Sequence, residues 1–304
     1  MLRLKEKFTQ NPVILKEMRG RMRGGRAFIL LTVYLFVLSS LISMIYLAFL
    51  PTTTSGTNIL TLRQTLGKTL FGTTMLLLLF TACFVAPALT AGSISSEREG
   101  QTFDLLRTTL LPARSLVMGK LNSSFLFISL LLFAGLPLLS LATIFGGVTY
   151  AEIAIGSIVL IVTTLTFSAV GVFFSSFTKR TLVSTVLAYS FTLMLVFGLP
   201  VFLTMGIIFF GVLSSSPSGM STLTEIMIAA AIYLMIMLNP ISAAVVSEII
   251  LLNEQTAFFF LLPSPWGSIS YPIVSPWLGY TFTYLLLSLV LIWLSIRFVR
   301  QAER

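Results

Sequence analysis

The residues of this chain that could take part in chemistry are concentrated in one stretch, SEREGQTFDLLR, which runs from Ser96 to Arg107. It holds Glu97, Arg98, Glu99, Asp104 and Arg107 and separates two long apolar runs. Carboxylate and guanidinium groups form ion pairs and charge-assisted hydrogen bonds. The chain contains no histidine, which excludes histidine bases, histidine proton relays and His-ligated metal sites. The stretch therefore predicts a binding surface rather than a catalytic centre.

Spacing within this stretch predicts a short amphipathic helix over residues 96–111. Ser96 and Glu99 match the S-x-x-E capping box that marks a helix start, and Pro112 ends the element. One face of the helix carries Phe103, Leu106 and Leu110, and the opposite face carries Gln101, Asp104 and Thr108. A lipid-binding helix would be dominated by Lys and Arg, whereas mixed charge around an apolar face suits a groove on a protein partner. The alternative is a solvated loop that orders only locally.

Other chemistries lack their motifs. Gly67-Lys68-Thr69 ends like a phosphate-binding loop, but Leu62 stands where that motif needs its first glycine. A membrane-embedded transferase or protease would need clustered Asp, His or a serine with a base, and no such cluster emerges. The single cysteine, Cys83, allows no intramolecular disulfide. The sequence predicts that the chain is not itself an enzyme.

Composition predicts an all-α, polytopic integral membrane protein. Charged residues make up 10% of the 304 residues and apolar residues 56%, against about 25% charged in a typical soluble domain. A spanning helix needs about 20 mostly apolar residues. Six segments qualify, at residues 27–50, 70–91, 121–145, 153–174, 182–206 and 277–298, within a single transmembrane domain of residues 27–304. A seventh apolar segment, near Leu223–Leu238, is shorter and ends at Asn239-Pro240.

The distribution of Lys and Arg predicts that both termini are cytoplasmic. Residues 1–26 hold eight of these cations, the connector 92–120 holds four, Lys179 and Arg180 add two, and three follow Ile296. With six spans all of these fall on one side, and Arg63 and Lys68 fall on the other, as the positive-inside tendency requires. Ser214–Ser275 then becomes an outer-side segment with one or two helices that enter the membrane without crossing it. Eight spans would satisfy the same parity and stay open.

The first 26 residues predict an interfacial helix. They lack the order of a cleavable signal peptide, so the first span is expected to remain in place. After the helix start at Asn11-Pro12, apolar residues share one arc and the cations share another. Those cations, which would face anionic lipid, are Lys16, Arg19, Arg23 and Arg26. The alternative is a basic flank that only sets topology.

The connector also carries a family resemblance. The run SISSEREGQTFDLLRTTLLPARSLVMGKL resembles the signature of permease subunits of type-2 ATP-binding-cassette transporters. The matching residues are Gly92, Ile94, Ser95, Glu97, Arg98, Glu99, Asp104, Leu105, Leu106, Thr108, Leu110, Gly119 and Lys120. Gln101 departs from the signature, because it separates Gly100 from Thr102 where the signature has Gly-Thr. The opening NPVILKEMRGRMRGGRAF is similar to the subgroup that includes copper-enzyme-maturation permeases.

The resemblance implies a fold and a set of partners. The chain would be one six-span subunit of a homo- or heterodimer in the plasma (cell inner) membrane. It would contact a separate ATPase subunit, and ATP and Mg would bind to that subunit. No cofactor is expected in this chain, and no nucleic acid is expected as a partner. Residues 1–26 would be the connecting helix, residues 96–111 the coupling helix and Ser214–Ser275 the re-entrant segment. The residues expected to contact the ATPase are Ser96, Glu97, Arg98, Glu99, Phe103, Asp104, Leu105, Leu106, Arg107, Leu110 and Pro112.

The predicted function is therefore that of a transport subunit, acting as an exporter and driven by ATP hydrolysis in its partner. Two alternatives belong to other classes. A stand-alone secondary carrier would normally show charges at mid-membrane and an inverted repeat, whereas the predicted spans have no Asp, Lys or Arg near their centres. A membrane anchor would hold an ATPase without transporting anything. Stimulation of the ATPase by substrate would separate transport from anchoring.

Overall fold

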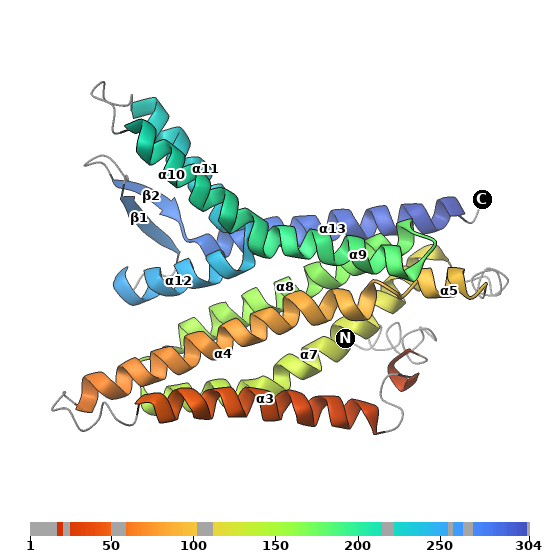
Figure 1. The fold of residues 1–304 in the computed structure, drawn as a ribbon, viewed down its shortest axis with the longest axis horizontal. Coiled ribbons are helices and arrows are strands. Elements are labelled where there is room, and N and C mark those ends of the chain that lie inside the picture. The colour runs from red at the N-terminus through yellow and green to blue at the C-terminus, as the bar shows by residue number, and fades with distance from the viewer. Residues whose placement is uncertain are drawn as a thin grey trace, which may run out of the picture. The chain divides into compact units, whose positions relative to one another are not determined.

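The computed structural model describes residues 17–20, 25–49, 59–101, 112–214, 222–254, 258–263 and 270–302. These residues are almost entirely helical, as Figure 1 shows. The predicted all-α, polytopic membrane fold is confirmed: within the described ranges, six helical segments are long and apolar enough to cross a membrane.

Each of the six segments covers its predicted span to within one residue, and most extend beyond it. They are α3 (Arg26–Phe49), α4 (Ile59–Thr90), α7 (Ala113–Phe145), α8 (Tyr150–Phe177), α13 (Pro276–Ala302), and a composite of α9 (Thr181–Leu193), the π-helical turn η2 (Met194–Gly198) and α10 (Leu199–Ser214). Helix α4 begins 11 residues before the predicted Leu70, and α7 begins eight before the predicted Leu121. Hydropathy marks only the length that needs hydrocarbon, whereas backbone hydrogen bonding continues into the polar layer.

Two units make up the chain. The first contains residues 1–149, 163–189 and 287–304, and the second contains residues 150–162 and 190–286. In the first unit, α3, α4 and α7 pack side by side (Figure 1). The α4–α7 core consists of apolar side chains that are almost fully buried, among them Leu78, Leu79, Val117, Leu121, Ile128 and Leu131.

Helices α4 and α7 approach each other closely at Gly67. A Cβ atom at this position would collide with the carbonyl oxygens of Gly146 and Ala142, at the end of α7. Helix α7 ends at Phe145, and Gly146 and Gly147 follow with φ angles of 86° and 87°, which glycine adopts without strain. Gly67 therefore lies inside α4, where a small residue lets α7 pack closely. It does not lie in a phosphate-binding loop, although Gly67-Lys68-Thr69 resembles the end of that motif.

The second unit contains a bent helix pair and a hairpin. Helices α11 (Thr222–Leu238) and α12 (Pro240–Glu254) meet at Asn239, and the apolar pair Ala229–Leu238 and Pro240–Leu251 bends by 112° there. Strands β1 (Phe259–Pro263) and β2 (Ser270–Val274) pair antiparallel, with Phe259 opposite Val274. Both helices lie within the segment 214–275, where one or two helices were predicted; the outer-side location of this segment stays a prediction. The hairpin was not predicted, because the continuous apolar run of β1 lacks the alternation that identifies a half-exposed strand.

Asn239 joins the bend to the π-helical turn. Its side-chain amide donates to the carbonyls of Leu195 and Val196, at 2.7 and 2.8 Å, and its amide oxygen accepts the Ser242 N–H at 2.7 Å. A π-helical turn disrupts the i→i−4 pattern, so its carbonyls need other donors. The residue that lets α12 start after the break also holds η2.

Candidate functional site

The connector that follows α4 is a tight turn and a one-turn helix, α5 (Ser95–Glu99). The predicted capping box is wrong: the N-cap is Ile94 and has no side-chain cap bond, while the Ser96 N–H bonds the Gly92 carbonyl at 3.1 Å. The predicted single helix beginning at Ser96 is also interrupted. Helical structure ends at Glu99, and Gln101 has a φ angle of +55°, a left-handed conformation that stops a helix.

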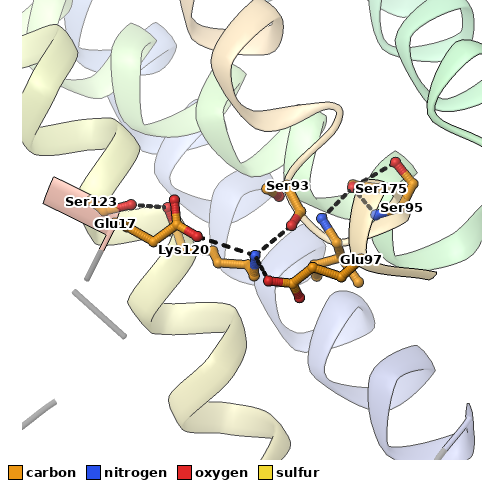
Figure 2. Close-up of polar contacts among 8 residues, drawn as sticks. Glu17, Ser93, Ser95, Glu97, Lys120, Ser123 and Ser175 are labelled. Atoms are coloured by element: carbon orange, nitrogen blue, oxygen red, sulfur yellow. Dashed lines mark hydrogen bonds and ion pairs between the residues drawn. The ribbon is translucent and has the colours of Figure 1, made fainter. Parts of the chain in front are cut away.

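The start of α5 is held by a serine from another helix. Ser175 Oγ, on α8, accepts the N–H groups of Ile94 and Ser95 at 2.8 and 2.9 Å (Figure 2). Ser184, on α9, donates its hydroxyl to the Ala91 carbonyl at 2.6 Å. All of these residues are buried. The first N–H groups of a helix have no partner inside it, and Ser175 supplies the acceptor that a local capping side chain would otherwise provide.

The end of α5 is tied to the start of α9. Glu99 Oε2 accepts the Thr181 N–H at 3.0 Å and the Thr181 hydroxyl at 2.6 Å. These hydrogen bonds, with the nearby Arg180 charge, hold the pKa of the Glu99 carboxyl below its usual range. Glu99 was predicted to serve the N-terminus of its own helix. It instead caps the N-terminus of α9, where a carboxylate is favoured by the exposed N–H groups.

A buried ammonium group lies on the other side of α5. Lys120, on α7, is 4% exposed. Its Nζ atom lies 2.7 Å from Glu97 Oε1 and 3.4 Å from Glu17 Oε1, and it donates to the Ser93 carbonyl. Figure 2 shows the ammonium between the two carboxylates, which come from the N-terminal segment and from α5. A buried cation is stable only when it is paired and hydrogen-bonded, and this arrangement supplies both.

The predicted contact residues divide between the described and the undescribed parts of the chain. Ser96, Glu97, Arg98 and Glu99 lie on α5, and Pro112 is the N-cap of α7. Burial lowers the pKa of Arg98. The remaining predicted contact residues lie outside the described residues; they are Phe103, Asp104, Leu105, Leu106, Arg107 and Leu110.

The predicted interfacial helix is also described only in part. Residues 17–20 are helical and Arg19 is exposed, while Lys16 and Arg23 lie outside the described residues. Arg26 is the first residue of α3, so the span helix starts at the position where the interfacial segment was expected to end.

Lys120, Ser175, Thr181 and Ser184 were missed as site residues. Lys120 was available as a signal, because it is among the residues that carry the family resemblance. Ser175, Thr181 and Ser184 follow the connector by about 80 residues and belong to no motif. Serine and threonine hydroxyls inside helices often bond a carbonyl of their own helix, and nothing in the local sequence separates these three residues from those that do.

The arrangement holds one short helix against several other elements. Within one turn of helix, α5 is attached to α8, α9, α7 and the N-terminal segment through polar groups that range from buried to exposed. Polar groups that bond several neighbouring elements hold a short helix in place from more than one side. Helix α5 is thus fixed to its neighbours at both of its ends and at Glu97.

Fold and site together define a polytopic α-helical membrane protein with a rigidly anchored connector between its second and third spans. Residues 12–298 match the family model described as ABC-2 family transporter protein. The chain belongs to this family, which makes it a membrane permease subunit of an ATP-binding-cassette transporter and implies partnership with an ATPase subunit of that class. No curated protein matches the chain.

Proposed function

We propose that this permease subunit is part of an exporter and that the segment 96–111 is its coupling element. ATP binding would draw the partner ATPase subunits together, and the segment seated on each would move with them. The anchoring of α5 supports this role, because a coupling element must transmit force in both directions. The single observation that carries the proposal is the contact of Ser175 and Thr181 with the two ends of α5.

The contacts suggest the route of the movement. Ser175 lies near the end of α8 and Thr181 at the start of α9, so a shift of α5 acts on two consecutive spans at their shared connector. Ser184 adds a second attachment to α9 through the Ala91 carbonyl. Spans that move as packed bodies alternate between discrete arrangements rather than deforming continuously. In this scheme the ends of α8 and α9 move as one body with α5.

Several features of the assembly belong to the same proposal. Both termini and the connector would be cytoplasmic, since Lys and Arg concentrate on that side. The permease would act as a homo- or heterodimer in the cytoplasmic membrane, and ATP and Mg would bind to the ATPase subunit. The opening sequence NPVILKEMRGRMRGGRAF supports a relationship to the copper-enzyme-maturation subgroup. Spans nearly free of charge favour an amphipathic or lipid-like substrate.

Affinity co-purification in mild detergent tests the proposal. The wild-type chain is compared with a Phe103→Asp/Leu106→Asp variant, which places two charges on the predicted apolar face. The control is Thr108→Asp, which adds a charge to the predicted opposite face. We expect mass spectrometry to find an ATP-binding-cassette ATPase with the wild type and the control, but not with the apolar-face variant.

Each failure has a distinct meaning. A folded wild-type chain that captures no ATPase would contradict the coupling proposal and favour a stand-alone secondary carrier. Capture that survives in the Phe103→Asp/Leu106→Asp variant would place the contact elsewhere. Capture without stimulation of ATP hydrolysis by any transported substrate would favour a membrane anchor.

A further inference from the structure

One buried cation joins three segments that are far apart in the sequence. The three hydrogens of the Lys120 ammonium group can serve three acceptors, and the structure provides three: the Ser93 carbonyl, Glu97 and Glu17. Glu97 precedes Lys120 by 23 residues and Glu17 precedes it by 103. The N-terminal segment is therefore attached to the connector through a side chain of α7.

Electrostatics gives the cation a stabilising role in this arrangement. Both carboxylates lie within 3.4 Å of the same nitrogen atom. Without the ammonium group, two negative charges would face each other at short range in a partly desolvated place, where repulsion is stronger than in water. Loss of the Lys120 charge should therefore separate Glu17 from Glu97 as well as remove two ion pairs.

The two ion pairs are unequal. The Glu97 side chain is 19% exposed and lies at 2.7 Å, whereas the Glu17 side chain is 28% exposed and lies at 3.4 Å. The longer and wetter contact is the weaker one, since water screens it more. Lys120 is thus held more firmly by α5 than by the N-terminal segment, and the Glu17 contact is the one that would break first.

We propose that Lys120 is a positioning residue that fastens the N-terminal segment around Glu17 to the coupling connector, so that this segment moves with α5 during the transport cycle. The proposal rests on the coupling role given to α5 above. The segment around Glu17 then follows α5 and α7 through Lys120, in addition to its chain connection to α3. A helix lying on the membrane surface would in this way be coupled to the connector that meets the ATPase.

Spin labelling of the chain alone tests the attachment. Arg19 is exposed and lies two residues from Glu17, and Cys83 is the only cysteine and is buried. A label at Arg19→Cys in a Cys83→Ala background therefore reports on the N-terminal segment. We expect an immobile spectrum with Lys120, loss of the immobile component in Lys120→Met, and its retention in Lys120→Arg. Lys68→Met, which removes a lysine of α4 outside this cluster, serves as the control and should leave the spectrum unchanged.

A second variant addresses misfolding. If Lys120→Met does not fold, Glu17→Gln removes only the weaker arm, and the label should become mobile while the thermal transition stays near that of the wild type. In the Glu17→Gln background, Lys120→Met should change label mobility no further, because both changes break the same link. A label that stays immobile in a folded Lys120→Met or Glu17→Gln variant would overturn the proposal.

A transport assay distinguishes a positioning role of Lys120 from a role in stability alone. In the assembled transporter, Lys120→Met is expected to lower the amount of substrate moved per ATP hydrolysed while the ATPase still co-purifies, and Lys120→Arg should restore that ratio. An unchanged ratio in a folded Lys120→Met variant would contradict the mechanical role. The label experiment needs no ATPase, so its failure is distinguishable from failure of the coupling proposal, which the co-purification detects.

Discussion

The Glu99 carboxylate caps a helix that starts 82 residues later in the chain, accepting two hydrogen bonds from Thr181. The contact joins the connector between the second and third spans to the connector between the fourth and fifth. Two connectors of the first unit are thus held together by one side chain. This side chain belongs to the element proposed to meet the ATPase, so its loss should affect both stability and coupling.

The Glu99 contact predicts a specific dependence of stability on pH. Because the folded state lowers the pKa of Glu99, the contact stabilises the protein fully above the unfolded glutamate pKa of about 4.3, and this contribution is lost as pH falls through the lower folded pKa. Glu99→Gln should therefore lower the apparent unfolding temperature at neutral pH, and the difference from wild type should shrink below about pH 4. Thermal unfolding in detergent across this range measures it.

A hydroxyl control accompanies this experiment. The Thr185 hydroxyl bonds the Thr181 carbonyl within its own helix, so Thr185→Val removes a threonine hydroxyl without touching Glu99. We expect Thr181→Val to weaken stability more than Thr185→Val does. A difference between Glu99→Gln and wild type that stays constant from pH 7 to pH 3 would show that the charge of Glu99 has no part in the effect.

Ser175 and Ser176 form a matched pair for testing the anchor of α5. Both are buried, but Ser175 accepts two backbone N–H groups of the connector, whereas Ser176 donates to the Phe173 carbonyl of its own helix. Ser175→Ala leaves two buried donors unpaired and should cost about 1–3 kcal/mol of unfolding free energy. Ser176→Ala should cost less than about 1 kcal/mol, since the carbonyl keeps its helical partner.

Hydrogen exchange adds a local measurement to the Ser175 prediction. The amides of Ile94 and Ser95 should exchange faster in Ser175→Ala and at the wild-type rate in Ser176→Ala, because only the first change removes their acceptor. Equal protection of these two amides in both variants would mean that Ser175 does not hold α5.

Gln101 is strained where the chain leaves α5. Its φ angle of +55° raises the free energy of the folded state by about 1–2 kcal/mol for a residue other than glycine. Glycine would remove this strain. Part of the gain would be lost, because glycine also gives the unfolded chain more conformational freedom. Gln101→Gly should therefore raise the unfolding free energy by about 0.5–1 kcal/mol. Gln101→Ala keeps its Cβ atom and should give no comparable gain. If both variants unfold at the wild-type temperature, the turn carries no strain.

Two glycines of α4 should respond in opposite directions to the same substitution. A Cβ atom at Gly67 would meet the carbonyl oxygens of Gly146 and Ala142, whereas one at Gly72 would meet nothing within 4 Å. Gly67→Ala should destabilise the protein by about 1–3 kcal/mol because backbone must shift. Gly72→Ala should stabilise it by up to about 1 kcal/mol through helix propensity. Chemical unfolding of both variants in the same detergent decides whether α4 and α7 make this close contact.

The sequence predicted the spans because the physics behind them is local. About 20 apolar residues in a row must form a helix in hydrocarbon, since every backbone polar group has to find its partner within the segment. The predicted end of the third span at residue 145 agrees with the end of α7, which Gly146 and Gly147 follow. The bend at Asn239-Pro240 was recognisable in part, because proline after asparagine breaks one helix and can start another.

The anchoring of the connector could not be predicted in this way. Ser96 and Glu99 have capping-box spacing, but they do not cap α5. The Ile94 and Ser95 N–H groups donate to Ser175 instead, and the Glu99 carboxylate accepts from Thr181. A local motif specifies which groups need partners, but any correctly placed donor or acceptor can satisfy them. Sequence spacing therefore suggested a helix start near the right place and assigned the wrong bonds.

The sequence by itself determined that this chain is a helical membrane protein, where its spans lie, and which stretch carries the family signature, because hydropathy and motif spacing act over a few turns of helix. Only the tertiary structure decided that Lys120 lies between Glu17 and Glu97, and that α8 and α9 hold the two ends of α5. These pairings depend on how buried helices pack, and packing brings together residues that no local pattern connects.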